Sequence, residues 1–246
     1  MRPDPAARTH PPQLDLPGQT HVAEGPHDQT GMYVMHFAFR RDLAAFSSAV
    51  RQTPLGDAGT WRALAARWSR FAEVLHHHHE AEDDAYWPLL AAAAAERGSA
   101  GDQDEVAAMT EEHAGIDPEL DACREAFVRV LEHPCDAHRN ALDIRVTGLR
   151  ELLLEHLHHE ETVVLPMLQR LWTTEEFEAA EKGVQKHYPP KEAPFIVAWA
   201  LWRLPEPARD RMVGLAGPAY AVLHRVVRRR FARRELATFR YADPQV

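Results

Sequence analysis

The chain has 246 residues, of which 45% are hydrophobic, and a formal net charge of −9 at pH 7. This composition excludes a chain that is disordered throughout, and no segment reaches the ~20 consecutive apolar residues of a membrane-spanning helix. The acidic balance argues against a nucleic-acid binder, while two cysteines and the lack of an apolar leader predict a cytoplasmic protein without a disulfide scaffold.

Residues 1–28 are expected to form a flexible, proline-rich tail, because they contain six prolines and no apolar periodicity. Helical periodicity begins at about residue 29. Four long helical segments are predicted, at about 29–52, 60–96, 103–132 and 137–172.

The four segments are separated by short connections rich in glycine or proline, so the fold class predicted for residues 29–172 is an all-α, up-down four-helix bundle. Asp102 and Asp136 are the expected N-caps of the third and fourth helices. Pro88 and Pro166 lie within the second and fourth helices, where each predicts a kink.

Residues 173–246 are predicted to form a separate helical extension. Thr173 and Glu176 have the spacing of a capping box, and six prolines then divide the remainder into short helices. The last part, residues 207–246, has nine arginines against three acidic residues.

The arginines of residues 223–234 alternate with apolar residues. One interpretation is a helix that binds a membrane surface or a nucleic acid. The favoured interpretation is a helix docked by its apolar face on Trp199 and Trp202, with its arginines balancing the acidic bundle.

An internal repeat with an offset of 77 to 78 residues is the most informative feature of the sequence. Each half has one histidine on its first helix and a His-x3-Glu pair on its second. The matched residues are His36, His78 and Glu82 in the first half and His113, His156 and Glu160 in the second.

Four consecutive histidines precede Glu82, and the repeat distinguishes among them. Only His78 has a histidine counterpart in the second half. His76, His77 and His79 have none, and they are rotated from the direction of His78 on a helix, so all three are predicted not to bind metal.

Residues at positions i and i+4 share one helix face, so an imidazole and a carboxylate with this spacing can reach one metal ion. Two such helices and two further histidines predict a two-metal site, with ions about 3.5–4 Å apart. Mixed nitrogen and oxygen ligands suit Fe, Mn or Zn better than Ca or Mg. A buried His–Glu hydrogen bond is the alternative for one pair, but burying four histidines and two glutamates without metal would be very costly.

The segments HHHHEAEDDAYWPLL and HLHHEETVVLPML resemble the repeated motif of hemerythrin-like, HHE cation-binding domains. HFAFRRDL and EEHAGIDPEL resemble the first and third helices of that family, and the resemblance covers residues 29–172. The C-terminal extension resembles one found in actinobacterial members. The resemblance implies two Fe ions in a non-heme di-iron centre, with Mn or Zn as alternatives. It implies as ligands His36, His78, Glu82, His113, His156 and Glu160.

The sequence departs from the oxygen-carrying hemerythrins, which have a second histidine one turn along the third helix. Asp117 occupies that position here, and a carboxylate, a water molecule or Tyr33 is expected to complete the site. Tyr33 is also the candidate catalytic residue, because it shares a helix face with His36.

The expected function is therefore a redox enzyme, peroxidase-, catalase- or oxygenase-like, that reacts with O2, H2O2 or NO. A non-enzymatic O2 or iron sensor and a structural zinc bundle are the alternatives. The sequence leaves open whether an organic substrate exists, and it leaves the oligomeric state open.

Overall fold

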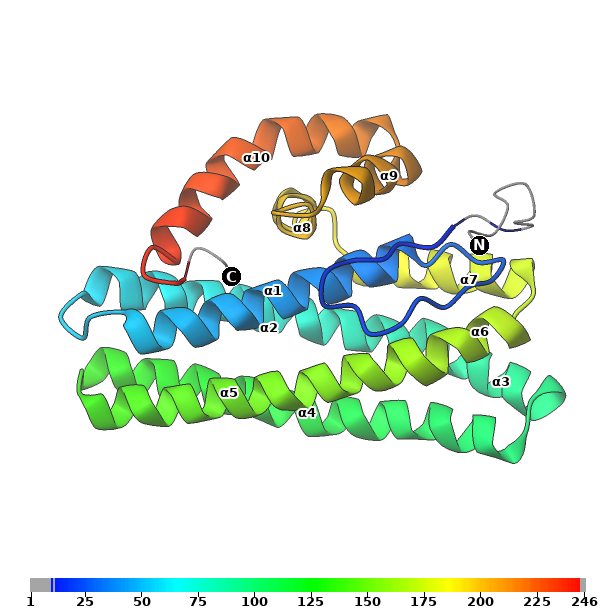
Figure 1. Cartoon of the computed structure of the whole chain (residues 1–246), viewed down its shortest axis with the longest axis horizontal. Coiled ribbons are helices and arrows are strands. Elements are labelled where there is room, and N and C mark those ends of the chain that lie inside the picture. The colour runs from blue at the N-terminus through cyan, green and yellow to red at the C-terminus, as the bar shows by residue number, and fades with distance from the viewer. Residues whose placement is uncertain (1–9, 11, 244–246) are drawn as a thin grey trace, which may run out of the picture.

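The structure, a computed structural model, describes residue 10 and residues 12–243, and the described chain is helical without strands (Figure 1). Its main body is the expected up-down four-helix bundle. The first arm is α1 (Thr30–Gln52) and the third is α4 (Ala100–Glu132). The second and fourth arms are composite and lie antiparallel to these two. Among the described residues, no helix is both long and apolar enough to cross a bilayer.

Each composite arm contains a π-helical turn. The second arm consists of α2 (Ala58–Ala81), η2 (Glu82–Tyr86) and α3 (Trp87–Arg97), and the fourth of α5 (Asp136–His159), η3 (Glu160–Val164) and α6 (Leu165–Leu171).

Each π turn ends two residues before a proline: η2 before Pro88 and η3 before Pro166. The Trp87 and Leu165 amides bond to the carbonyls of Glu82 and Glu160, five residues earlier. A proline has no N–H for the usual helical bond, and its ring clashes with the carbonyl four residues before it. The wider turn avoids that clash, so π turns take the place of the expected kinks.

The helix caps differ from the predicted ones by one to three residues. Ser99, not Asp102, is the N-cap of α4, and Asp102 completes a capping box with it from the third helical position. Cys135 caps α5 one residue before the expected Asp136. In the extension, the Thr173 capping box is confirmed.

Aromatic side chains fill the bundle toward the end at which α1 connects to α2 and α4 connects to α5. The Phe46 ring lies 4.9 Å from Trp68 and 5.8 Å from Phe71, and the Trp68 ring lies 5.5 Å from Phe127, all measured between centroids. Each of these rings is at most 1% exposed. The rings meet edge-on or tilted, the geometries that aromatic pairs prefer, and they pack the first three arms against one another.

Residues 12–28 pack against α1 and α6, which differs from the expected flexible tail. The Gln13 and Gln169 side-chain amides both donate to the His27 carbonyl, at 2.9 and 2.7 Å. Gly25 approaches Gln169 so closely that a Cβ would lie 2.3 Å from its Oε1. Glutamine side chains thus supply the backbone partners that a segment without secondary structure lacks. Residues 1–9 and 11 lie outside the described part of the chain.

The extension lies along one side of the bundle (Figure 1). It comprises α7 (Thr174–Val184), η4 (Gln185–His187), α8 (Ala193–Ala200), α9 (Glu206–Ala216) and α10 (Pro218–Thr238). Helix α7 packs on η2, where Gly183 lies so close to Ala85 that an added Cβ would be 2.6 Å from the alanine Cβ. Helix α10 is longer than the short helices expected and arches over α8.

The Arg-rich helix α10 docks through Phe231, whose ring lies 5.7 Å from Phe195 and 6.1 Å from Trp202. The expected contact with Trp202 is therefore present. Trp199 packs instead on Phe39 of α1, at 5.2 Å, and its indole N–H donates to Asp42 at 2.7 Å.

Asp42 is the centre of a buried charge network that joins the extension to the bundle. Its carboxylate accepts from Arg41 at 2.8 Å and from Arg67 at 2.5 Å. Arg67 also donates to Glu235 of α10 at 2.8 Å. Since these groups are nearly inaccessible, the network depends on every partner being present.

Candidate metal centre

The six predicted ligands lie in the middle of the bundle. Each of the four arms contributes, because each matched histidine or glutamate falls on the inward face of its helix. All six side chains are buried, with exposed fractions of 0 to 4%.

The two glutamates lie between the two halves of the repeat. Glu82 has one carboxylate oxygen 3.1 Å from the Nε2 atom of His78 and the other 3.6 Å from the Nε2 atom of His113. Glu160 has one oxygen 3.1 Å from His36 Nε2 and 3.9 Å from His156 Nε2. Each carboxylate thus faces a histidine of its own helix and one of the other half, the arrangement of a bridging ligand.

Buried polar atoms without hydrogen bonds are concentrated at this site. Among the described residues they include the Nε2 atoms of four histidines and all four oxygens of two glutamates, in His36, His78, His113, His156, Glu82 and Glu160. Such atoms in a protein interior are normally satisfied, and a shared cation satisfies nitrogen and carboxylate oxygen together. The donor set therefore fits one or two transition-metal ions.

The opposite ring nitrogens of three histidines are held by carboxylates. His36 Nδ1 lies 2.9 Å from Glu161, His113 Nδ1 lies 3.1 Å from Asp83, and His156 Nδ1 lies 2.7 Å from Glu112. A carboxylate at this position fixes the ring and presents the other nitrogen as a lone pair.

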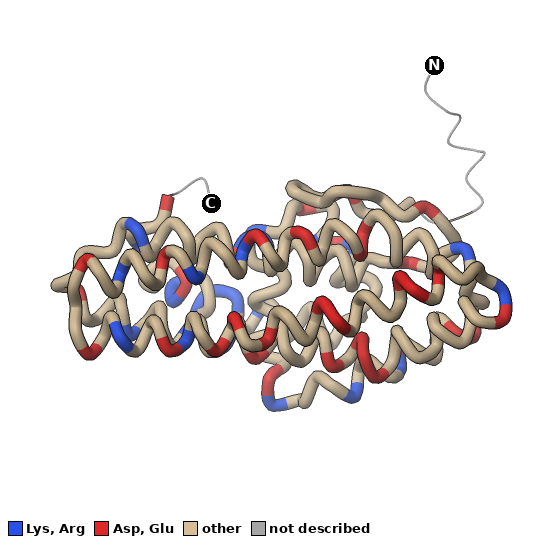
Figure 2. The backbone as a smooth tube through the Cα atoms, turned by 90° about the horizontal axis from the view of Figure 1, so that it is seen from below, with Lys and Arg blue, Asp and Glu red and all other residues tan. Residues whose placement is uncertain are grey.

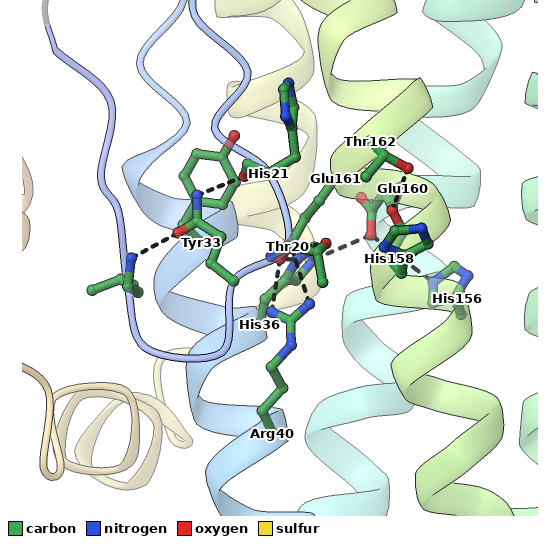
Figure 3. A network of polar contacts seen from close by, with 12 residues as sticks. Thr20, His21, Tyr33, His36, Arg40, His156, His158, Glu160, Glu161 and Thr162 are labelled. Atoms are coloured by element: carbon green, nitrogen blue, oxygen red, sulfur yellow. Dashed lines mark hydrogen bonds and ion pairs between the residues drawn. The ribbon is translucent and has the colours of Figure 1, made fainter.

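Glu161 is the most heavily bonded of these acids (Figure 3). Its oxygens accept from the Thr20 amide and hydroxyl, both at 2.8 Å, and from the two terminal nitrogens of Arg40, at 2.7 and 3.0 Å. The N-terminal segment is thereby fastened to the residue that orients His36.

The electrostatics of the cluster favour a cation. Burial and the neighbouring His36 lower the pKa of His78 to about 3, so that this imidazole is neutral. Burial and the charge of Glu160 raise the pKa of Glu82 well above its usual value. Burial opposes the charge of His36, but Glu160 and Glu161 outweigh it and raise its pKa to about 9. The metal-free site therefore retains protons that a metal ion displaces.

His79, predicted to lie outside the site, is brought into it. Its ring is 2% exposed and stacks on His113 with 4.0 Å between centroids, and 5.4 Å separates it from His156. Both of its ring nitrogens lack partners. Two groups of three residues each bring their ligand atoms within 4.8 Å of one another. One group is His36, His78 and Glu82, and the other is His79, His113 and His156.

The other two histidines of the run lie away from the cluster. His76 is half exposed and bonds Asp117 at 3.1 Å, and His77 lies 3.5 Å from Glu192. Asp117, the residue at the position of a carrier's additional histidine, thus faces His76. His79 of α2 occupies the place beside His113. It can do so because one residue along a helix turns the side-chain direction by about 100°, so His79 points away from the direction of His78.

Tyr33 is a buried residue of α1, but its hydroxyl accepts a hydrogen bond from the Ala23 amide at 2.8 Å and so binds the N-terminal segment. Burial raises its pKa to about 12.

A cavity of about 180 Å³ adjoins the site, with His78 and Glu82 in its wall. Tyr86, Tyr188 and Tyr220 also line it. The buried Tyr86 hydroxyl donates to Glu181 of α7. The sequence reasoning missed Tyr86 although it lies four residues after Glu82, because its counterpart in the second half is Val164. Tyr188 and Tyr220 belong to the extension, which the repeat does not include.

The comparison with protein-family models gives one match, described as Hemerythrin HHE cation binding domain, over residues 29–168. This range exceeds half of the chain, contains all six predicted ligands and His79, and ends before α7. No curated protein and no solved structure matches the chain.

Proposed function

The chain belongs to the hemerythrin HHE cation-binding family, and we propose that its bundle holds two iron ions and uses them on O2, peroxide or NO. The observation that supports two ions is the position of Glu82 and Glu160. Each carboxylate lies between histidines of both halves, and each half presents imidazole nitrogens without another partner. The proposed ligands are the six of the repeat together with His79.

Bound iron supplies a Lewis acid and a source or acceptor of electrons for small oxygen species. The protein restricts which molecules can reach the iron. A cavity of about 180 Å³ admits O2, H2O2 or NO and leaves little room for a large organic substrate.

Tyr86 is the residue of the chain best placed to hold a proton near the ligands. It is buried in the cavity wall, and burial together with Glu181 raises its pKa well above the usual value, so that the hydroxyl stays protonated. Its single hydroxyl proton is donated to Glu181, and the phenol can donate it to a reacting oxygen in the cavity only by exchanging that bond. We propose Tyr86 in this role in place of Tyr33.

Non-enzymatic sensing of O2 or iron is the alternative. It is favoured by the buried network through which Asp42 of α1 contacts both α8 and α10, since this network joins the bundle to the extension.

The experiment combines metal analysis with peroxide turnover on the purified full chain. Two irons per chain, a near-ultraviolet band and catalytic loss of H2O2 support the proposed enzyme, and a Tyr86→Phe variant should keep the iron and lose most turnover. Two irons without turnover would favour the sensor. One ion per iron-saturated chain would contradict the two-metal site, and zinc without iron would indicate a structural bundle.

A further inference from the structure

A hollow of about 930 Å³ lies between α2, α8 and α10, on the side of the bundle covered by the extension. Figure 1 shows the arrangement of these helices: α10 arches away from the bundle and returns to it near its C-terminal end, with α8 beneath the arch. Binding sites for small organic molecules have volumes of about 300–1,000 Å³. The hollow is therefore large enough for a ligand much bigger than those that fit the cavity beside the ligands.

The base of the hollow is apolar. Phe195 of α8 and Phe231 of α10 form one wall, with Val227 beside them, and Ala63 and Ala66 of α2 form the other. The two alanines leave space between the helices, which larger side chains would fill. An apolar chain can be buried here at a gain of about 25 cal/mol per Å².

The rim of the hollow carries positive charge that the protein does not neutralise. Arg230 and Arg234 lie one turn apart on α10, both exposed, and Lys191 precedes α8. Within the described chain, none of these three forms an ion pair. These cations lie on a protein with a net charge of −9, whose bundle helices carry acidic residues along their length (Figure 2).

The acidic residues of the hollow are already engaged. Asp57 pairs with Arg240, and Glu235 pairs with Arg67. They therefore do little to offset the three free cations, and an anion that enters meets an uncompensated positive rim.

Arg67 supplies an independent observation. Its side chain is 6% exposed, and two of its nitrogens bond Asp42 and Glu235, but Nη1 is buried without a partner. Its guanidinium lies 5.3 Å from the Phe195 ring. The hollow thus has a buried cation with an unused donor nitrogen in its wall, and such a donor is normally satisfied.

We propose that this hollow binds an amphipathic anion, a small molecule with an apolar chain and a terminal carboxylate or phosphate. The chain lies against Phe195, Val227 and Phe231, and the anionic head pairs with Arg230 and Arg234. The site is separate from the metal centre and does not depend on the proposed redox function.

The test uses isothermal titration of the full, metal-loaded chain with dodecanoate and dodecyl phosphate below their micelle concentrations. We expect saturable binding of one molecule per chain. Dodecanol, which has the same apolar chain without the charge, should bind at least tenfold more weakly.

Two double variants localise the charge. Arg230→Gln with Arg234→Gln should weaken dodecanoate at least tenfold. Arg228→Gln with Arg229→Gln makes the same charge change on the same helix outside the hollow, and should change the affinity less than twofold. Ala63→Phe, which fills the base, should abolish binding of both anions. Circular dichroism and iron content check that each variant is folded.

Several results would overturn the proposal: no saturable binding, equal affinity for dodecanol, or equal weakening by the two double variants. Dodecanoate and dodecyl phosphate distinguish a carboxylate from a phosphate ligand. Vesicles of phosphatidylglycerol form the last arm. Binding to these vesicles without binding to the monomeric anions would identify a membrane-surface helix instead and refute a small-molecule site.

Discussion

Replacing Glu161 by glutamine tests the idea that the N-terminal segment, α1 and the metal ligands are held by one carboxylate. Glutamine keeps the size of the side chain and removes its charge. Arg40, whose side chain is 10% exposed, would then face a neutral amide, and the His36 ring would lose its carboxylate partner.

Two estimates of the cost agree. Removing one partner from a buried charged pair costs about 3–5 kcal/mol. Burial raises the pKa of Glu161, but His36 and Arg40 outweigh it and lower that pKa from 4.5 to about 2. A difference of this size corresponds to about 3 kcal/mol of folding stability at neutral pH. Because the folded-state pKa is lowered, this contribution is complete above pH 4.5 and is lost as the pH falls toward 2.

The assay is urea unfolding of the metal-free protein at pH 7, together with iron affinity from competition with a chelator. Glu161→Gln should lower the free energy of unfolding by about 3 kcal/mol. Iron affinity should fall about 10- to 100-fold, the usual effect of losing the carboxylate that orients a histidine ligand. Limited proteolysis should cut the segment around Thr20 faster.

The repeat provides a matched control in Asp83→Asn. Asp83 occupies the corresponding position and orients His113, but it is a third exposed and has no arginine partner. The Asp83→Asn variant should lose a similar factor in iron affinity, but its free energy of unfolding should fall by only about 1 kcal/mol or less. Equal losses of stability in the two variants, or an unchanged Glu161→Gln protein, would refute the reasoning.

Three further predictions follow from the site and the extension. His79→Gln should weaken the binding of one iron at least tenfold, whereas His76→Gln should leave iron content unchanged; unchanged iron binding in both variants would restore the assignment from the repeat. Iron binding near pH 7 should release protons, because the raised pKa of His36, about 9, keeps its ring protonated in the metal-free site, so affinity should rise with pH. Calorimetry in buffers of different ionisation enthalpy measures this release, and its absence would contradict the assignment. Asp42→Asn should cost about 3 kcal/mol in urea unfolding and expose α8 and α10 to hydrogen exchange, and unchanged protection would show that the network does not hold the extension.

The bundle was predictable because its signals are local. Long apolar periodicities and short connections locate the four arms to within a few residues, and the repeat identifies the inward face at His78 and His156. The π turns were not predictable in type, since Pro88 and Pro166 indicate only that a normal helix is interrupted.

The remaining differences arise from tertiary packing. The repeat argued against His79 because its counterpart is Leu157, yet α4 lies beside α2 and receives a side chain rotated by one residue. Tyr33 shares a face with His36, but the N-terminal segment occupies its hydroxyl. That segment has no periodicity to reveal its docking, which depends on Gln169 more than 140 residues away.

Two of the three carboxylates that orient histidines cross between the halves of the chain. His36 of the first half depends on Glu161 of the second, and His113 of the second depends on Asp83 of the first. A single helical hairpin therefore lacks the carboxylate that orients the histidine of its first helix, whereas two identical hairpins related by a two-fold axis would supply it to each other. In one chain that contains both hairpins, each half still supplies the carboxylate of the other, but the two halves need not have the same sequence and can diverge. His79 opposite Leu157 is such a divergence, and it would make the two proposed metal positions chemically unequal.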